Sequence, residues 1–251
     1  MENIQEYLPQ QVQGKKVLIS GGTTGIGRAT AVLLAKLGAT VAVFGRHEQE
    51  LNDALRDIEE QAGVTVIGFT ADTAKEEDIK KIFDTVKEEL GGLDVLINNA
   101  AIGFGSVTDG GYKDWEYAVK TNLLGYLACA GEAIKIMKDN GGGHIVNIGS
   151  MSADVREEKS AVYVATKSGI QGFSEALRKQ VNPDGIKISL IEPGAVDTDM
   201  QQQDTEKKRE EVASGKMLKA DDIAMAVLYC ISQPKRCDVV ELKVRPHLQL
   251  I

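Results

Sequence analysis

The feature that most constrains the fold is a regular alternation of short β-rich runs with longer helical patterns. Seven apolar runs predict strands at residues 16–20, 40–45, 64–69, 93–98, 144–149, 187–192 and 239–244. The segments between the first six runs are long enough for crossover helices, so these strands should be parallel with right-handed crossovers. Near-continuous apolar strands fit a sheet that is covered on both faces. We therefore predict an α/β fold, a doubly wound and mostly parallel seven-stranded sheet with helices on both faces.

The alternation predicts a single domain over residues 1–251, which includes an N-terminal arm at residues 1–14. No proline-, glycine- or serine-rich linker and no internal repeat interrupts it. Residues 199–219 differ, because they are polar, mixed in charge and follow the sixth strand directly. Two interpretations stay open for them. They form a solvated helix and loop, or a mobile flap over the ligand crevice, since functional loops gather at the carboxyl ends of strands.

The charge balance and the cysteines limit the partners and the compartment. The 29 lysines and arginines face 37 acids, a formal charge of −8, which argues against nonspecific nucleic-acid binding. No stretch approaches the roughly 18 apolar residues of a membrane span, and the N-terminus lacks the pattern of an export signal. Cys129, Cys230 and Cys237 are odd in number and fit no metal-ligand spacing. We expect a soluble, cytoplasmic protein with reduced thiols, no bound metal and no membrane contact.

A glycine-rich segment, SGGTTGIGRAT, follows the first predicted strand and opens an apolar helix. Gly21, Gly25 and Gly27 would permit a tight turn, close approach of the backbone to a pyrophosphate, and an anion at the positive helix N-terminus. Thr23 and Thr24 could add hydroxyl donors to the phosphates. A tight turn without a ligand is the alternative, but the place of the segment between a strand and a helix favours a Rossmann dinucleotide site.

The end of the second predicted strand bears on the choice of cofactor. In a dinucleotide fold, an acid near this point would bond the adenosine ribose and repel an extra phosphate. This chain instead has Gly45 followed by Arg46, which can pair with a 2′-phosphate. We therefore expect NADP (NADPH) in preference to NADH. His47 is a possible second contact, and a merely solvated arginine is the alternative.

A tyrosine and a lysine stand out in the helix predicted at about residues 160–180. Its apolar stripe, at steps of three and four, consists of Val162, Ala165, Gly169, Phe173 and Leu177. Tyr163 and Lys167 lie off this stripe and share a face at i and i+4. Because a nearby cation favours the phenolate, we expect the tyrosine pKa to fall from ~10 toward a range useful for acid–base catalysis. Ser150, at the end of the fifth predicted strand, could hold a substrate oxygen beside the phenol, and Ser152 is a competing candidate.

Taken together, these motifs resemble the short-chain dehydrogenase/reductase family over nearly the whole chain. SGGTTGIG resembles its T-G-x-x-x-G-x-G turn, INNAA its N-N-A-G with Ala101 for glycine, and EPGAVDT its P-G-x-V-x-T, while GS before YVATK completes the set. The resemblance implies that Tyr163 is the general acid/base, that Ser150 orients the carbonyl, and that Lys167 binds the nicotinamide ribose and lowers the tyrosine pKa. It also implies that Asn122, in KTNLLG, holds a proton-relay water.

The same resemblance implies further contacts with the cofactor. Asp72 and Thr73 would contact adenine. The other implied contacts are Ile26 in the glycine turn, Asn98, Asn99 and Ala100 on the adenosine side, and Pro193, Gly194, Val196 and Thr198 on the nicotinamide side. For Asn98 and Asn99 the alternative is that they mainly brace the sheet.

The substrate is less constrained than the cofactor. Phe104, Met151, Val155 and residues 199–219 would shape its pocket by their placement after strand ends. The C-terminal V-x-E-L-x-V-R-P resembles the branch of the family that acts on 3-hydroxy acids and related hydroxy amino acids. This ending makes a ketoacyl-carrier role less favoured.

The sequence thus predicts an NADP-dependent enzyme that reversibly transfers hydride between the nicotinamide and a carbonyl or secondary alcohol, such as a 3-hydroxy acid, a hydroxy amino acid or a small ketone. A catalytically silent NADP(H)-binding sensor or scaffold is one alternative, and a lyase or epimerase another. The resemblance also implies a homo-oligomer, a tetramer or dimer, built through the long helices around 112–138 and 160–180 and the last strand.

Overall fold

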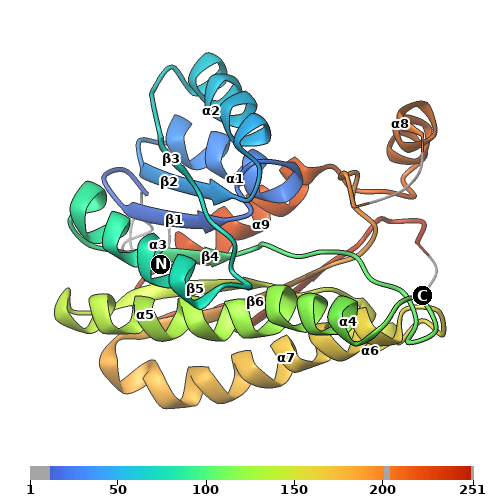
Figure 1. The fold of residues 1–251 in the computed structure, drawn as a ribbon. Coiled ribbons are helices and arrows are strands. Elements are labelled where there is room, and N and C mark those ends of the chain that lie inside the picture. Colours follow the sequence, from blue (N-terminus) through green and yellow to red (C-terminus); the bar gives the residue numbers. More distant parts are fainter. Residues whose placement is uncertain (1–11, 201–203, 250–251) are drawn as a thin grey trace, which may run out of the picture.

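A seven-stranded parallel sheet forms the centre of the molecule (Figure 1). The computed structural model describes residues 12–200 and 204–249. The strand order is β3-β2-β1-β4-β5-β6-β7, and all six pairings are parallel. The strands are β1 (Lys16–Ser20), β2 (Thr40–Gly45), β3 (Ile67–Thr70), β4 (Val95–Asn98), β5 (Gly143–Ile148), β6 (Ile186–Pro193) and β7 (Glu241–Val244).

Helices cover both faces of this sheet, which confirms the predicted doubly wound fold. They are α1 (Gly25–Lys36), α2 (Glu48–Ala62), α3 (Glu76–Thr85), α4 (Tyr112–Val119), α5 (Gly125–Asp139), α6 (Ser152–Val155), α7 (Ala161–Val181), α8 (Thr205–Ala213) and α9 (Ala220–Ile231). Short π-helical turns η2 (Val86–Leu90) and η3 (Lys120–Leu124) extend α3 and join α4 to α5, and the 3₁₀ turn η4 (Asn182–Asp184) follows α7. Within the described ranges no helix is long and apolar enough to cross a membrane.

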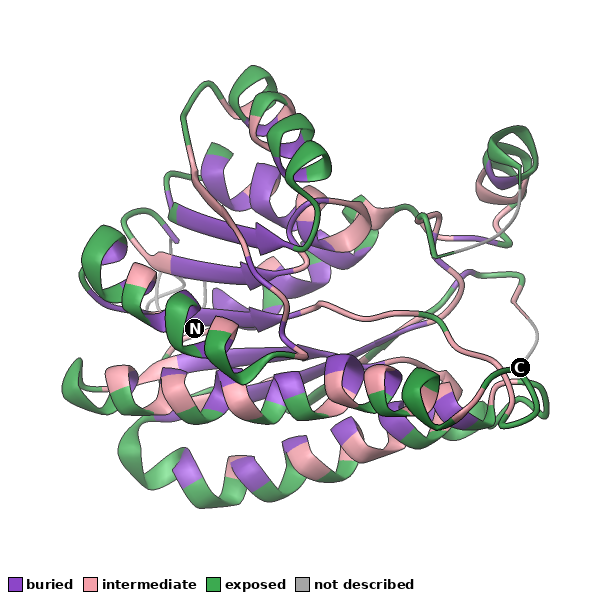
Figure 2. Cartoon of the chain, viewed as in Figure 1, coloured by how far each residue is buried: buried purple, intermediate pink, exposed green. Residues whose placement is uncertain are grey.

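The strands hold the two helical layers together because alternate side chains face opposite sides of a sheet. In β1, Val17 and Ile19 pack in the layer of α1, α2 and α9, whereas Leu18 packs in the layer of α3, α5 and α7. Figure 2 shows the strands as a buried band between the two layers. Full burial of each such side chain stabilises the fold by roughly 1.5–3 kcal/mol. A sheet covered on both sides leaves its carboxyl edge as the place for a ligand.

Three strands begin later than the sequence predicts. β3 begins at Ile67 rather than 64, because α2 ends at Gly63 in a left-handed conformation and Val64 lies exposed in the connection to the sheet. β4 begins at Val95 and β7 at Glu241, each two residues late. Other apolar residues of these connections, namely Val66, Leu93 and Val239, pack against the core without joining the strand ladder, so apolar runs overestimate strand length.

The buried face of α7 differs from the predicted stripe. Ala165 is exposed and Lys167 is buried, whereas the sequence prediction had Ala165 inside and Lys167 off the packed face. The buried residues of this helix are Val162, Thr166, Lys167, Ile170, Ser174, Leu177 and Val181. Polar members of this set are accommodated by hydrogen bonds, such as Asn147 Nδ2 to the Ser174 hydroxyl at 2.9 Å. A stripe drawn from apolar residues alone was therefore rotated away from the true packing face.

The polar segment 199–219 contains one exposed helix. Within it α8 stands away from the sheet (Figure 1), and Lys208 is its one buried residue. Lys208 Nζ donates to the Thr198 carbonyl at 2.7 Å, and Leu218 pairs with Val196. The described part of the segment thus contains a helix, and motion as a flap stays a prediction. Of the predicted N-terminal arm, residues 1–11 lie outside the described residues, while the Gly14 amide donates to the Gly38 carbonyl at 2.8 Å.

Candidate active site

A large open pocket lies where the parallel strands end. It has a volume of about 740 Å³ and is lined by the segments that follow β1, β2, β3, β4, β5 and β6. β1 and β4 are neighbours although β2 and β3 lie between them in the chain, so the connections after them leave in opposite directions. Such a switch point opens a crevice at the carboxyl edge, and the pocket occupies it.

The glycine turn after β1 leaves no room for side chains. Gly21 has φ +62°, and a Cβ built at Gly27 would overlap the Gly21 carbonyl oxygen. Thr24 is the N-cap of the twelve-residue α1, whose first turn contains no acid. Unpaired amides at a helix N-terminus and the positive end of its dipole favour an anion. The turn therefore has the shape and the charge that a pyrophosphate requires.

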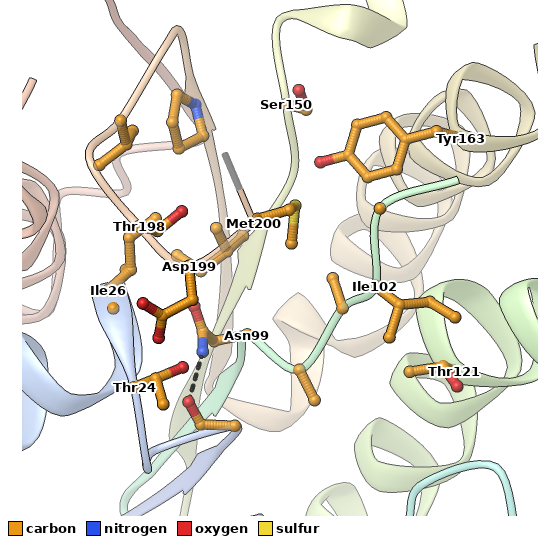
Figure 3. Close-up of a pocket in the computed structure, with 18 of the residues that line it drawn as sticks. Thr24, Ile26, Asn99, Ile102, Thr121, Ser150, Tyr163, Thr198, Asp199 and Met200 are labelled. Carbon is orange, nitrogen blue, oxygen red and sulfur yellow. Dashed lines mark hydrogen bonds between the residues drawn. The ribbon is translucent and has the colours of Figure 1, made fainter. Parts of the chain in front are cut away.

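The glycine turn is fastened to the segment after β4. The buried Ser20 hydroxyl accepts hydrogen bonds from the Asn99 amide at 2.9 Å and the Ala100 amide at 3.0 Å. Asn99 Nδ2 in turn donates to the carbonyls of Ser20 and Gly21, each at 3.0 Å. Asn99 and Ala100 also line the pocket, so the asparagine both braces the turn and faces the ligand space (Figure 3).

Asn98 does not line the pocket and differs in this from the prediction of a cofactor contact. Its side chain is buried, and its Nδ2 donates to Asn147 Oδ1 at 3.0 Å and to the Tyr126 carbonyl at 3.3 Å. These bonds tie the end of β4 to β5 and to the backbone of α5. The alternative interpretation, that it braces the sheet, matches its place in the structure.

Arg46 lines the pocket after β2 and is held by Tyr117, a residue that was not predicted from the sequence. Its guanidinium donates to the Tyr117 hydroxyl and lies 5.6 Å from the centre of that ring. Tyr117 donates to Asp72 Oδ2 at 2.9 Å. Asp72 itself does not line the pocket, contrary to its expected adenine contact, while Thr73 does. The carboxylate instead anchors the tyrosine that orients the arginine.

Tyr163 and Ser150 meet at the other end of the pocket, where the phenol points into the cavity (Figure 3). Burial raises the pKa of Tyr163, a hydrogen bond with the Ser150 side chain lowers it, and the Glu157 charge raises it further. The net shift is upward, opposite to the fall that the sequence predicts. The reason is that burial disfavours the phenolate more than the surrounding groups favour it.

Lys167 is buried directly behind the phenol. Its Nζ donates to the Ile148 carbonyl at 2.9 Å and lies 5.7 Å from the centre of the Tyr163 ring and 5.4 Å from that of Tyr126. The predicted i, i+4 proximity of the pair is thus present. Burial lowers the pKa of Lys167 to about 7, although the Glu192 carboxylate opposes this fall.

Asn122 lies in the π-helical turn η3 and does not line the pocket. Its Oδ1 accepts from the Ile102 amide and its Nδ2 donates to the Ile102 carbonyl, both at 2.8 Å. This pair of bonds fixes the segment that follows β4 along one wall of the pocket. Single π-helical turns within α-helices are frequent at functional sites. The water that the family resemblance assigns to Asn122 stays a prediction.

Glu192 is a buried acid near the site, and it was not predicted from the sequence. It is fully buried, and neither carboxylate oxygen has a hydrogen-bond partner among the described residues. The nearest cation is Lys243, with its Nζ 3.7 Å from Oε2. Burial, with the charges of Asp154 and Glu241 adding to it, raises the pKa of Glu192 to about 7.

The raised pKa gives a prediction for Glu192→Gln. The folded protein binds a proton that the unfolded chain releases between pH 4.5 and about 7, so wild-type stability falls as the pH rises through this range. We expect the variant to avoid this loss and to be more stable than wild type by about 1–3 kcal/mol at pH 8, with little difference at pH 4.5. Urea unfolding at the two pH values measures it, and an equal effect at both would contradict the prediction.

Most of the predicted site residues line this one pocket. These are Gly21, Thr23, Thr24, Gly25, Ile26, Arg46, His47, Thr73, Asn99, Ala100, Ser150, Tyr163, Lys167, Pro193, Gly194, Val196 and Thr198, with Phe104, Met151 and Ser152 at the substrate end. Gly27, Asp72, Asn98, Asn122 and Val155 do not line it.

Several lining residues were missed from sequence. Glu50 lies at the Arg46 end, and Glu157, Ser160 and Gln249 lie at or near the Tyr163 end. Gln249 Oε1 accepts from the Ala195 amide at 3.1 Å, which brings the C-terminal segment to the strand end after β6. No local motif marks these positions. The spacing of Glu157 and Ser160 just before Tyr163 is the one signal that could have indicated two of them.

The fold and the site together define a doubly wound dinucleotide-type α/β protein with a Ser–Tyr–Lys group at the carboxyl edge of its sheet. Residues 15–209 match the model of the short chain dehydrogenase family. An uncharacterized oxidoreductase of Staphylococcus aureus strain MRSA252 is 33% identical over 233 residues, 92% of this chain and 97% of the relative. A second, from Staphylococcus saprophyticus, is 30% identical over 237 residues, 94% and 99% of the two chains. This chain belongs to the short-chain dehydrogenase family, and it is an oxidoreductase of that type.

Solved structures agree in fold. A short-chain dehydrogenase/reductase from Mycobacterium marinum superposes with a TM-score of 0.85 at 24% identity, covering 94% of this chain and 96% of that one. L-Sorbose reductase from Gluconobacter frateurii, complexed with NADPH and L-sorbose, gives a TM-score of 0.85 at 22% identity over 95% and 98% of the chains. The family uses a nicotinamide cofactor, and the glycine turn described above fits its pyrophosphate.

Proposed function

We propose that this chain is an NADP(H)-dependent oxidoreductase that reversibly transfers hydride between the nicotinamide and a carbonyl or secondary alcohol. One observation carries the proposal. Ser150, Tyr163 and Lys167 converge at one end of a pocket whose other end contains the glycine turn and Arg46. The neighbouring fold that is described as complexed with NADPH and L-sorbose supports a reductase of this kind.

The pocket offers a place for each part of the dinucleotide. Its pyrophosphate would lie on the amides at the start of α1, with Thr23 and Thr24 beside it. A 2′-phosphate would pair with Arg46, whose guanidinium suits a phosphate better than a point charge does. The nicotinamide end would lie against the wall formed by Pro193, Gly194, Val196 and Thr198.

Tyr163 would move the proton of the reaction. When bound, the nicotinamide supplies or accepts the hydride at the substrate carbon. In reduction the Tyr163 hydroxyl gives its proton to the carbonyl oxygen, and in oxidation the phenolate takes the proton from the alcohol. Ser150 would hold the same oxygen by a hydrogen bond. Because burial raises the pKa of Tyr163, the protein environment favours the neutral phenol, which is the form that donates the proton in reduction.

The experiment is a cofactor assay with purified full-length protein. NADPH should be oxidised in the presence of at least one member of a panel of 3-oxo acids, diketones and aldehydes, and NADH should be oxidised much more slowly. Product analysis by mass spectrometry should show the corresponding alcohol. Tight NADPH binding without oxidation by any carbonyl would instead favour the silent sensor or scaffold. A product formed without net change in the cofactor would favour the lyase or epimerase.

The location and the assembly belong to the same proposal. The three cysteines are free, with Cys129 and Cys230 buried and Cys237 exposed, which suits a cytoplasmic enzyme. Exposed apolar side chains at Val119, Leu124 and Leu127 lie along the α4–α5 helix and suit a dimer or tetramer built through it. Sedimentation of the purified protein measures the assembly.

A further inference from the structure

The pocket differs in charge between its two ends. The basic side chains that line it, in the part of the chain that the structure describes, are Arg46, His47 and Lys167. Arg46 and His47 follow β2, at the end away from Tyr163. Glu157 is the acid that lines the Tyr163 end, since Asp199 is turned toward Thr24 and Asn99 (Figure 3). A substrate near the phenol therefore meets a negative charge.

Among the described residues, Lys167 is the cation that lines the Tyr163 end of the pocket, and its ammonium is already engaged. The residue is 2% exposed, its Nζ donates to the Ile148 carbonyl, and this nitrogen lies over the Tyr163 ring, 5.7 Å from its centre. Arg156, next in the chain to Glu157, does not line the pocket, and its Nε lies 3.4 Å from the Ala153 carbonyl to which it donates. A carboxylate in the substrate would thus find at this end, among the described residues, no lining cation other than the buried Lys167, whose ammonium is already bonded to the Ile148 carbonyl.

Glu157 is held in place beside the phenol by its loop. Arg156 adopts φ 57° and turns the chain after α6, and the Ser160 amide donates to the Glu157 carbonyl at 3.1 Å. The Ser152 hydroxyl donates to Glu157 Oε1 at 3.1 Å. The second carboxylate oxygen stays open to a donor from the ligand. Glu157 and Tyr163 both line the pocket, and the Glu157 charge raises the pKa of the Tyr163 phenol.

The rest of the substrate end is mainly apolar. Phe104 and Met151 line it, and Met200 lies across from Tyr163 with its sulfur toward the cavity (Figure 3). Met200 is in contact range of the loop after β4, because a Cβ at Gly103 would lie 3.4 Å from its side chain. These side chains suit the apolar part of a small carbonyl compound, while Glu157 suits a hydrogen-bond donor or a cation.

We propose that the substrate is an uncharged or ammonium-bearing ketone or alcohol, whose hydrogen-bond donor or cationic group faces Glu157, and that carboxylate-bearing ketones and 3-hydroxy acids are poor substrates. This inference rests on the proposed hydride transfer at Tyr163. It narrows the substrate classes that the sequence left open. It also differs from the substrate class, 3-hydroxy acids, of the family branch that the C-terminal residues resemble. Repulsion by Glu157 and the lack of an accessible pairing cation among the described residues at the Tyr163 end both disfavour a carboxylate.

The test compares three small methyl ketones with NADPH: 4-oxopentanoate, its methyl ester, and 5-(trimethylammonio)pentan-2-one. In wild-type protein kcat/KM should be lowest for the carboxylate. In Glu157→Gln the ratio of the carboxylate to the ester should rise, and the ratio of the ammonium ketone to the ester should fall, each about two- to fivefold, as for an exposed ion pair. Glu158→Gln, an exposed neighbouring acid outside the pocket, is the matched control and should change neither ratio.

The outcomes distinguish failure of the inference about the substrate class from failure of the proposed hydride transfer. A wild-type preference for 4-oxopentanoate over its ester would overturn the inference and leave the proposed reaction intact. So would ratios that stay unchanged in Glu157→Gln. Failure to oxidise NADPH with any of the three ketones and with the wider carbonyl panel would overturn the reaction itself, and the inference with it.

Discussion

Replacing Tyr163 by phenylalanine is expected to remove nearly all turnover while NADPH binding stays close to that of wild type. The phenol hydroxyl points into the pocket beside Ser150, and the ring itself packs against Lys167. Phenylalanine keeps the ring and removes only the proton donor. Loss of a general acid costs about 10²–10⁴-fold in rate. Steady-state NADPH oxidation gives kcat, and quenching or transfer of cofactor fluorescence gives the binding constant.

Tyr112→Phe is the matched control for this variant. Tyr112 is 75% exposed at the start of α4 and does not line the pocket, so its hydroxyl should not affect the rate. Wild-type turnover in Tyr163→Phe would show that another group moves the proton. A parallel loss of turnover and of NADPH binding would show that the variant damages the pocket rather than the acid.

Arg46→Glu is expected to raise the KM for NADPH about 10- to 100-fold and to change that for NADH little or in the opposite direction. Hydrogen bonds to a charged group contribute roughly 1.5–3 kcal/mol, which corresponds to this range. The side chain lies at the end of β2, held by Tyr117, where its guanidinium can pair with a 2′-phosphate. The glutamate would repel that phosphate and could accept from the ribose hydroxyls of NADH.

The control for the cofactor variant is Arg56→Glu. Arg56 is an exposed arginine on α2 that pairs with Asp53 outside the pocket, so reversing its charge reproduces the change in net charge alone. Equal changes in KM for the two cofactors in Arg46→Glu would remove the claim of a 2′-phosphate contact. A change of the same size in Arg56→Glu would show that the effect is one of overall charge.

The fold could be predicted from sequence because its signal is local and repeated. Apolar runs separated by helix-length segments leave few topologies, and parallel strands with crossover helices are the one that covers both faces. The glycine turn was also predictable, since Gly21 and Gly27 are required where backbone atoms come too close for a Cβ. Strand starts were less predictable, as Leu93 shows, because an apolar residue can pack in the core beside a sheet without joining it.

The electrostatics of the site could not be predicted in the same way. The sign of the Tyr163 pKa shift depends on how deeply α7 is buried, and Lys167 turned out to belong to its packed face. The Arg46–Tyr117–Asp72 chain joins three elements that are far apart in sequence. A motif names residue types at a spacing, whereas burial and long-range partners are properties of the assembled fold.

The central claim is that this pocket brings a substrate carbonyl, a reduced nicotinamide and the Tyr163 phenol together for direct hydride transfer. The most direct measurement uses NADPH that carries deuterium at the transferable C4 position, mixed with wild-type protein and a ketone that supports oxidation. The account predicts an alcohol that carries deuterium on its former carbonyl carbon. Cofactor oxidation that leaves the alcohol unlabelled, with the deuterium in solvent, would contradict it.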